Sequence, residues 1–355
     1  YRYNLHMIKN LSPSRASQYK TCPQQFKFAN IDKIEEPTTH VQAKGTLVHE
    51  ALEEMYKLPP EDRPSYISEE ESEEELNIIK NTEKDSGPKS KQLHDIFRNI
   101  FQDKRSSDEY FHLFVDREKN TKFGKESLEL LTNYLTLEDP KNVKSIENER
   151  WVRGTIEDLN LRGILDRMDE DEEGNLIIVD YKSGKAPDEK YKKARFFAMK
   201  LYALLIEMEL GIMPKELRLI YLQNSKIHTE KVTKEKLEDA KEEILEIWQK
   251  IKESVEKNSF PPKKNPLCKK WCYYKKICPL FNDSPPDTDR LNILKELITD
   301  KKESLKAISV FKDPSDYPEK LKNLNEEQLE KDIKLLEIEK NDIENKISIL
   351  LKKNA

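Results

Sequence analysis

The chain has 355 residues, of which 37% are charged and 36% hydrophobic, and its formal net charge is −5. These figures describe a charge-rich, largely helical protein with room for two ordinary domains, or one larger domain with an appendage. No apolar run reaches the roughly 18–20 residues of a membrane span and no signal-peptide pattern opens the chain, so we expect a cytoplasmic protein without membrane contact. The net charge does not by itself indicate a nucleic-acid binder.

The first third of the chain predicts helices. Ser12-Pro13-Ser14 is a helix start, and residues 43–57 form an amphipathic helix with His49 beside its apolar face. Residues 58–92 are rich in Pro, Glu and Ser, and predict an irregular or mobile insertion. Helical periodicity returns between about 91 and 135.

The middle of the chain predicts a small sheet flanked by helices, an α/β or α+β core. A long helix over about 188–210 should end at Gly211, and another over 233–257 should follow the last strand. The turn between the second and third strands is Asp171–Asn175. Periodicity of two and β-branched runs predict strands at 146–153, 160–168, 176–182, 216–223 and 226–232.

The last seventy residues predict two charged helices, at 289–306 and 326–352. In the second helix, apolar residues recur at alternating steps of four and three, which is a heptad pattern. A hairpin that folds on itself or on the core is favoured over a dimerising coiled coil. The apolar positions are Leu329, Ile333, Leu336, Ile343, Ile347 and Leu350.

Asp180 and Lys182 are two residues apart on the third predicted strand, so they point to the same side of the sheet. If the hairpin turns about Glu173, the residue opposite Asp180 is close to Asp166. Two carboxylates and one ammonium then lie within a few ångströms. Carboxylates of this kind hold Mg²⁺ or Mn²⁺, and a lysine can orient the attacking water or stabilise a charged phosphate.

The alternative is a surface hairpin with an ordinary ion pair, because Asp-x-Lys is common by chance. LIIVD, however, is a buried-strand run that ends in its acid, and Gly184 follows soon after. This arrangement favours a functional site. His49, preceded by Gly45-Thr46 and followed by an amphipathic helix, adds a second element.

The segments GTLVHEALEEMY, GILDRMD and VDYKSGK, a helix with LYALL, and C-x3-C-x5-C-P follow one another in this order. Together they resemble the RecB-like branch of the PD-(D/E)XK nucleases. The chain looks most like the RecB-family exonucleases of actinobacteria, and is similar to the CRISPR-associated adaptation nuclease and the AddB nuclease domain. The resemblance covers about residues 11–285 and leaves the tail outside.

The resemblance implies a restriction-endonuclease-like core with a helical C-terminal appendage, divided into a nuclease domain at 1–285 and a tail at 286–355. It implies that His49, Asp166, Asp180 and the Tyr181 carbonyl bind Mg²⁺ or Mn²⁺, and that Lys182 is the catalytic lysine. Glu149 stands where many relatives carry an acid near the site, although it could equally be a solvated strand residue.

Tyr202 matches the tyrosine of the helix that follows the hairpin in this family, where it belongs to the catalytic set. Relatives carry a glutamine four residues before this tyrosine, and Ala198 stands there instead. The metal-binding set is complete, which favours an active enzyme. The missing amide leaves open a catalytically weak DNA-binding or scaffold subunit of a helicase–nuclease complex.

Three of the four cysteines lie within eleven residues, which indicates a metal site in a cytoplasmic protein. Four thiolates suit a [4Fe–4S] cluster, and tetrahedral Zn²⁺ is the alternative. The iron–sulfur members of the family match this spacing, with a solitary early cysteine. We expect the cluster to be structural, because it closes a long loop. The four are Cys22, Cys268, Cys272 and Cys278.

Basic and aromatic residues alternate around the last cysteines, a composition that suits a path for single-stranded DNA. The candidates are Lys269, Lys270, Tyr273 and Lys275, with Trp271, Tyr274 and Lys276 beside them. Rings that pack on the cluster, with solvated lysines, are the alternative. The resemblance implies a single-strand DNA exonuclease in repair or recombination. The C-terminal helices could bind a helicase or another protein partner.

Overall fold

A computed structural model describes most of the chain, in two compact units. Unit 1 comprises residues 1–20, 37–105 and 112–259, and unit 2 comprises residues 21–36, 106–111 and 260–355. The domain boundary predicted at residue 285 stays a prediction. The residues described are 8, 10–81, 87–107, 109–110, 113–114, 116–188, 192–270, 272–281, 286–309 and 326–353.

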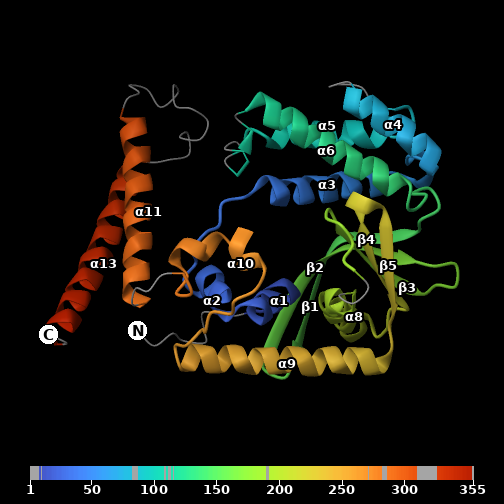
Figure 1. The fold of residues 1–355 in the computed structure, drawn as a ribbon. Helices are drawn as coiled ribbons and strands as arrows, with labels where there is room; N and C mark the ends of the chain where they lie inside the picture. The colour runs from blue at the N-terminus through green and yellow to red at the C-terminus, as the bar shows by residue number, and fades with distance from the viewer. Residues whose placement is uncertain are drawn as a thin grey trace. The chain divides into compact units, whose positions relative to one another are not determined.

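Unit 1 is built on a mixed sheet with the strand order β1-β2-β3-β4-β5 (Figure 1). The β1–β2, β2–β3 and β4–β5 pairs are antiparallel, and β3 and β4 are parallel. The parallel pair requires a crossover, which contains the helices between β3 and β4. The strands are β1 (Ser145–Ile156), β2 (Leu159–Glu170), β3 (Leu176–Lys182), β4 (Glu216–Tyr221) and β5 (Lys226–Lys231).

The predicted hairpin is confirmed. Glu170 pairs with Leu176, and the Asp171 carboxylate accepts hydrogen bonds from the backbone N–H groups of Glu173 (3.0 Å) and Asn175 (2.8 Å). Gly174 has a φ of +83°, a conformation that glycine adopts without strain. The turn therefore fixes the register of β2 against β3.

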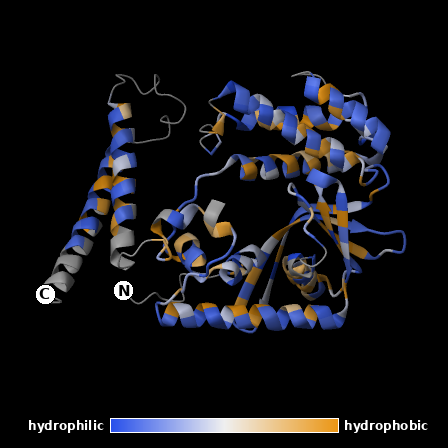
Figure 2. Ribbon diagram, viewed as in Figure 1, coloured by the Kyte–Doolittle hydropathy of each residue, from blue (hydrophilic) through white to orange (hydrophobic). Residues whose placement is uncertain are grey.

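Helices cover both faces of the sheet (Figure 1). Helix α8 packs against strands β1 to β4 and carries α9 on its outer side, while α3 contacts β1 and β2 and carries α5 and α6. Hydrophobic residues concentrate on the strands and on α8 (Figure 2). The helices are α1 (Pro13–Thr21), α3 (His40–Tyr56), α5 (Lys91–Lys104), α6 (Arg117–Leu135), α7 (Lys192–Arg195), α8 (Phe197–Leu210) and α9 (Lys234–Glu256).

The segment predicted to be irregular between 58 and 92 contains a helix, α4 (Glu69–Asn81), which packs against α6. The prediction was wrong because an acidic composition does not exclude a helix that buries one face, here Ser72, Glu75 and Ile79. Ser68 and Glu71 cap the helix reciprocally, and three glutamates in the first turn suit the helix dipole. Glu75 is buried and accepts hydrogen bonds from the backbone of Lys89 and Ser90. A short 3₁₀ turn, η3 (Pro60–Asp62), precedes α4.

Two other predicted elements differ in detail. The helix predicted over 188–210 is divided into α7 and α8 at Phe196, and residues 189–191 are outside the described chain. The strand predicted over 216–223 ends as β4 at Tyr221 and continues as a 3₁₀ turn, η6 (Leu222–Asn224). No helix in the described part of the chain is long and apolar enough to cross a membrane.

Unit 2 combines the cysteine region with a helical hairpin. The hairpin helices run antiparallel, and Ile308 packs against Leu329 between them (Figure 1). Lys301–Asp332 and Lys302–Glu337 ion pairs join the two helices. The elements are α2 (Pro23–Phe26), η2 (Lys27–Ile31), α10 (Leu267–Lys270), η7 (Tyr273–Ile277), α11 (Pro286–Ile308) and α13 (Glu326–Lys353).

Candidate active site

Strands β2 and β3 separate at the two predicted carboxylates. The last pair in their ladder is Arg167 with Val179, so that Asp166 and Asp180 face each other one step beyond it. Strand β3 continues beside β4 as far as Lys182. The Asp166 Oδ2 atom accepts a hydrogen bond from the backbone N–H of Tyr181 at 2.8 Å. The predicted pair of carboxylates is therefore assembled where the sheet opens.

Helix α3 brings His49 to this pair. Thr39 and Gln42 form a capping box that fixes the start of the helix, and the His49 Nδ1 atom lies 3.3 Å from Asp166 Oδ2. Burial lowers the pKa of His49, but the Asp166 and Asp180 carboxylates together outweigh burial, so the pKa lies above its ordinary value. Asp166 and His49 thus form a mutually stabilised pair.

Lys182 forms an ion pair with Asp180. The Lys182 side chain is 46% exposed and the Asp180 side chain 16% exposed, so the ammonium is accessible while the carboxylate is largely covered. Burial raises the pKa of Asp180 above its ordinary value, although the Lys182 ammonium opposes this. A phosphate could therefore contact Lys182 without displacing much of the protein.

Glu149 on β1 belongs to the same group of acids. Asn148 pairs with Arg167 and Arg150 with Leu165, which puts Glu149 opposite Asp166. Burial and the Asp166 carboxylate raise the pKa of Glu149 to about 7. Its φ of +47° is uncommon for a residue with a side chain, and such strain concentrates at functional sites.

Tyr202 on α8 reaches the sheet next to Gly163 of β2. A Cβ atom on Gly163 would lie 2.4 Å from the Tyr202 ring, so only glycine permits this approach. Burial, reinforced by the Asp180 carboxylate, raises the pKa of the Tyr202 phenol, which therefore stays protonated. One turn earlier, Ala198 is half-buried and has no polar group to offer.

Beneath the site lies a charged cluster that the sequence analysis missed. The Arg167 side chain is fully buried and forms ion pairs with Glu138 and Asp169, and its guanidinium contacts the Tyr181 hydroxyl. The Tyr181 ring in turn packs edge-on against His49, with 5.7 Å between ring centroids. The position of Arg167 directly after Asp166 was the only feature of the sequence that indicated a place for it near the site.

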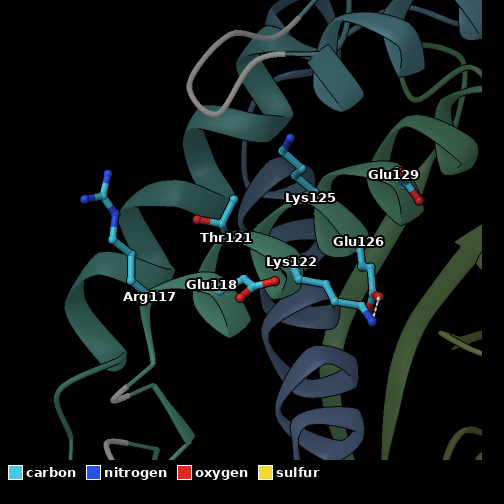
Figure 3. Close-up of a pocket in the computed structure, with 7 residues that line it drawn as sticks. All are labelled: Arg117, Glu118, Thr121, Lys122, Lys125, Glu126 and Glu129. Carbon is cyan, nitrogen blue, oxygen red and sulfur yellow. Dashed lines mark ion pairs between the residues drawn. The ribbon is translucent and has the colours of Figure 1, made fainter.

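A surface hollow of about 630 Å³ lies along α6, and none of the residues around the carboxylate pair lines it. Its lining includes Arg117, Thr121 and the Lys122–Glu126 ion pair (3.9 Å), all from one helix (Figure 3). Lysines and glutamates one turn apart neutralise each other on a solvated helix face. This hollow offers no chemistry comparable to that of the carboxylate pair.

The four cysteines line a single pocket in unit 2. Cys22, Cys268 and Cys278 are buried, Cys272 is half-buried, and no disulfide joins them. The backbone N–H groups of Lys263 and Asn265 donate to the sulfur atoms of Cys22 and Cys268, both at 3.4 Å. Burial raises the pKa of Cys272.

The predicted DNA-binding residues near the cysteines are only partly described. The side chains of Lys269 and Lys270, and the whole of Trp271, lie outside the described residues. Tyr273 is 47% exposed and packs edge-on against Tyr274, and Lys275 lies over the Phe281 ring at 5.5 Å. Their role in DNA binding stays a prediction.

Among the described residues, no group of three or more His, Cys, Asp or Glu side chains is arranged so that it could hold a metal ion. At the carboxylate pair, each acid has a basic side chain beside it. Lys182 forms an ion pair with Asp180, and the His49 Nδ1 atom lies 3.3 Å from Asp166 Oδ2.

Residues 10–279 match the family model of the PD-(D/E)XK nuclease superfamily. Because this match spans most of the chain, the protein belongs to the PD-(D/E)XK nuclease superfamily, whose members usually use divalent metals such as Mg²⁺. No curated protein matches the chain significantly.

A solved structure described as a putative exonuclease from Eubacterium rectale is similar to this chain. The two share 12% sequence identity over 74% of this chain and 86% of that chain, with a TM-score of 0.38. A likeness at this level adds no argument to the family match.

Proposed function

We propose that this nuclease is a Mg²⁺- or Mn²⁺-dependent deoxyribonuclease of the RecB-like branch that degrades single-stranded DNA from its ends in repair or recombination. The observation that carries the proposal is the placement of Asp180 opposite Asp166 where β2 and β3 separate, with Lys182 beside one acid and His49 beside the other. Family membership supports the nuclease activity, and the order of the motifs supports the branch.

The chemistry of the donors suits a divalent cation. Two carboxylates and one imidazole are ligands for Mg²⁺ or Mn²⁺. The buried Asp180 Oδ2 atom is the one that forms the ion pair with Lys182. His49, Asp166, Asp180 and the Tyr181 carbonyl would hold the ion, once Lys182 and His49 release the carboxylate oxygens. When bound, the ion lowers the pKa of a water molecule and neutralises charge on the phosphate.

The protein's own groups would then position the substrate. Lys182 is accessible, and its ammonium can orient the attacking water or stabilise the negative charge that builds on the phosphate. Tyr202, protonated in its buried position, can donate a hydrogen bond to a phosphate oxygen or a water. Glu149, opposite Asp166, can accept a proton near neutral pH.

The proposal is tested with the intact protein, Mn²⁺ and four substrates of the same sequence: linear and circular single-stranded DNA, linear duplex DNA and linear RNA. The linear single strand should be degraded fastest and the circle should stay intact. Cleavage of the circle would make the enzyme an endonuclease, and faster cleavage of RNA would overturn the assignment to DNA.

In unit 2, we propose that Cys22, Cys268, Cys272 and Cys278 bind a [4Fe–4S] cluster. Their shared pocket and the N–H donors to two of the sulfurs support it, because such hydrogen bonds stabilise charged thiolate ligands. Anaerobically purified protein should contain iron and sulfide in equal amounts. Zinc without iron would favour the tetrahedral Zn²⁺ alternative.

The alternative function is a catalytically weak DNA-binding or scaffold subunit of a helicase–nuclease complex, in which the α11–α13 hairpin contacts the partner. Ala198, which offers no amide near Tyr202, favours this alternative. A protein that binds single-stranded DNA with high affinity but leaves every substrate intact with Mg²⁺ or Mn²⁺ would support it.

A further inference from the structure

We propose that the outer face of the β1–β2 hairpin is a binding track for single-stranded DNA that leads to the carboxylate pair. This inference deepens the proposed function and rests on it for the nature of the substrate. Two cross-strand pairs form the track: Trp151 with Ile164, and Arg153 with Arg162.

Burial alternates along both strands. On β2, Leu161, Gly163 and Leu165 are buried while Arg162 and Ile164 are exposed. On β1, Val152 is buried while Trp151 and Arg153 are exposed. The track residues are therefore the outward-facing members of two amphipathic strands, and they have no role in the core.

Trp151 is the most conspicuous residue of the track. Its side chain is 65% exposed on β1, the edge strand of the sheet, and its partner Ile164 is 36% exposed. A large exposed apolar ring on an edge strand promotes aggregation unless a binding partner covers it. An exposed indole provides a flat surface on which a nucleic-acid base of any sequence can stack.

Arg153 and Arg162 lie directly opposite each other, an arrangement of like charges that destabilises a strand pair. Within the described part of the chain, neither forms an ion pair. The other strand arginines differ: Arg150 pairs with Glu147 and Glu209, Arg167 with Glu138 and Asp169, and Arg218 with Glu216. A phosphate between Arg153 and Arg162 would supply the missing negative charge.

The order along the strands gives the track a direction. Trp151 and Ile164 lie two residues from Glu149 and Asp166, a step of about 7 Å. Arg153 and Arg162 lie one further step away. Beyond them, Thr155 and Asn160 hydrogen-bond each other (2.9 Å), so their polar groups are already used. A strand held by the arginines and stacked on Trp151 would present its next phosphates to the acids.

The test measures binding separately from cleavage. A fluorescein-labelled oligothymidylate is titrated with the full chain in the presence of a chelator, and fluorescence anisotropy gives the dissociation constant. Trp151→Ala should weaken binding about tenfold, and Trp151→Phe should restore most of it. Arg153→Gln with Arg162→Gln should reduce the slope of log affinity against log salt by about 0.7, the value for one single-strand phosphate contact, because the two arginines share one phosphate.

Tyr66→Ala and Arg105→Gln are the matched controls, because both side chains are exposed elsewhere in unit 1, and they should leave binding unchanged. Unchanged affinity in the Trp151 and arginine variants would overturn the track, even if the wild type cleaves DNA. Weakened binding together with an inert wild type would leave the track standing and overturn the nuclease proposal. Equal weakening by the controls would also overturn the track.

Discussion

The Asp166 carboxylate accepts a hydrogen bond from the Tyr181 backbone N–H across the point where β2 and β3 separate. The Asp166 side chain therefore provides a hydrogen bond between the two strands just beyond their last backbone pair, Arg167 with Val179. This bond fixes the orientation of Asp166, whose same Oδ2 atom also lies 3.3 Å from His49 Nδ1.

Because of this bond, two substitutions of Asp166 can distinguish its structural role from its proposed catalytic role. Asp166→Asn keeps an oxygen that can accept from Tyr181, so the variant should fold normally and yet lose at least about 100-fold in cleavage rate. Asp166→Leu leaves the Tyr181 N–H without its acceptor and should also lose about 1–3 kcal/mol of stability. Urea unfolding and initial cleavage rates measure the two effects, and an Asn variant as active as wild type would remove Asp166 from the site.

The contact of Gly163 with Tyr202 predicts opposite results for two glycines. Gly163→Ala forces the Tyr202 ring to move and should cost about 1–3 kcal/mol. Gly124→Ala, in the middle of α6 with nothing near its Cβ position, should stabilise the protein by about 0.5–1 kcal/mol. Thermal unfolding compares them. Equal effects would show that the ring does not pack against Gly163.

The buried Arg167 cluster predicts a large loss of stability on truncation. Arg167→Met leaves Glu138 and Asp169 buried without their cation and should cost about 3–5 kcal/mol in the free energy of unfolding. Arg153→Met, on the exposed hairpin face, should change it by less than about 0.5 kcal/mol. Comparable small effects in both variants, measured by denaturant titration, would argue against the cluster.

His94 predicts how stability depends on pH. Burial, with the Arg98 charge, lowers the pKa of His94 to about 3, whereas an unfolded histidine titrates near 6.5. Below pH 6.5 the unfolded chain therefore binds the proton more readily, and stability falls by about 1.4 kcal/mol per pH unit from this group.

Between pH 6.5 and 5, the wild type should thus lose about 2 kcal/mol more than His94→Gln, whose side chain does not titrate. Urea unfolding of both proteins at pH 7, 6 and 5 provides the comparison. Parallel losses in the two proteins would show that His94 does not control this part of the acid response.

The hairpin could be predicted from sequence because strand periodicity and a short turn fix its register. A turn about Glu173 places Asp180 opposite Asp166 by counting alone, and the structure has this register. The separation of β2 from β3 could not be predicted in this way, because it depends on β4 pairing with β3 from a distant part of the chain.

Other features depend on which surfaces are covered, and this information is absent from local sequence. Arg167 and Glu138 are 29 residues apart, and nothing near either residue indicates that they meet. The sequence of α4 indicates a solvated acidic segment, whereas the structure buries Glu75. Trp151 has the sequence pattern of an ordinary strand residue, and only the assembled sheet shows that its side chain stays exposed.

The most direct test of the central claim is the cleavage rate of end-labelled single-stranded DNA by the wild type, Asp180→Asn and Glu172→Gln, each with Mn²⁺ and with a chelator. Glu172 is an exposed acid in the same hairpin turn and serves as the matched control. We predict metal-dependent cleavage by the wild type and Glu172→Gln, and a loss of at least about 100-fold in Asp180→Asn. Cleavage that persists in Asp180→Asn, or in the chelator, would contradict the account.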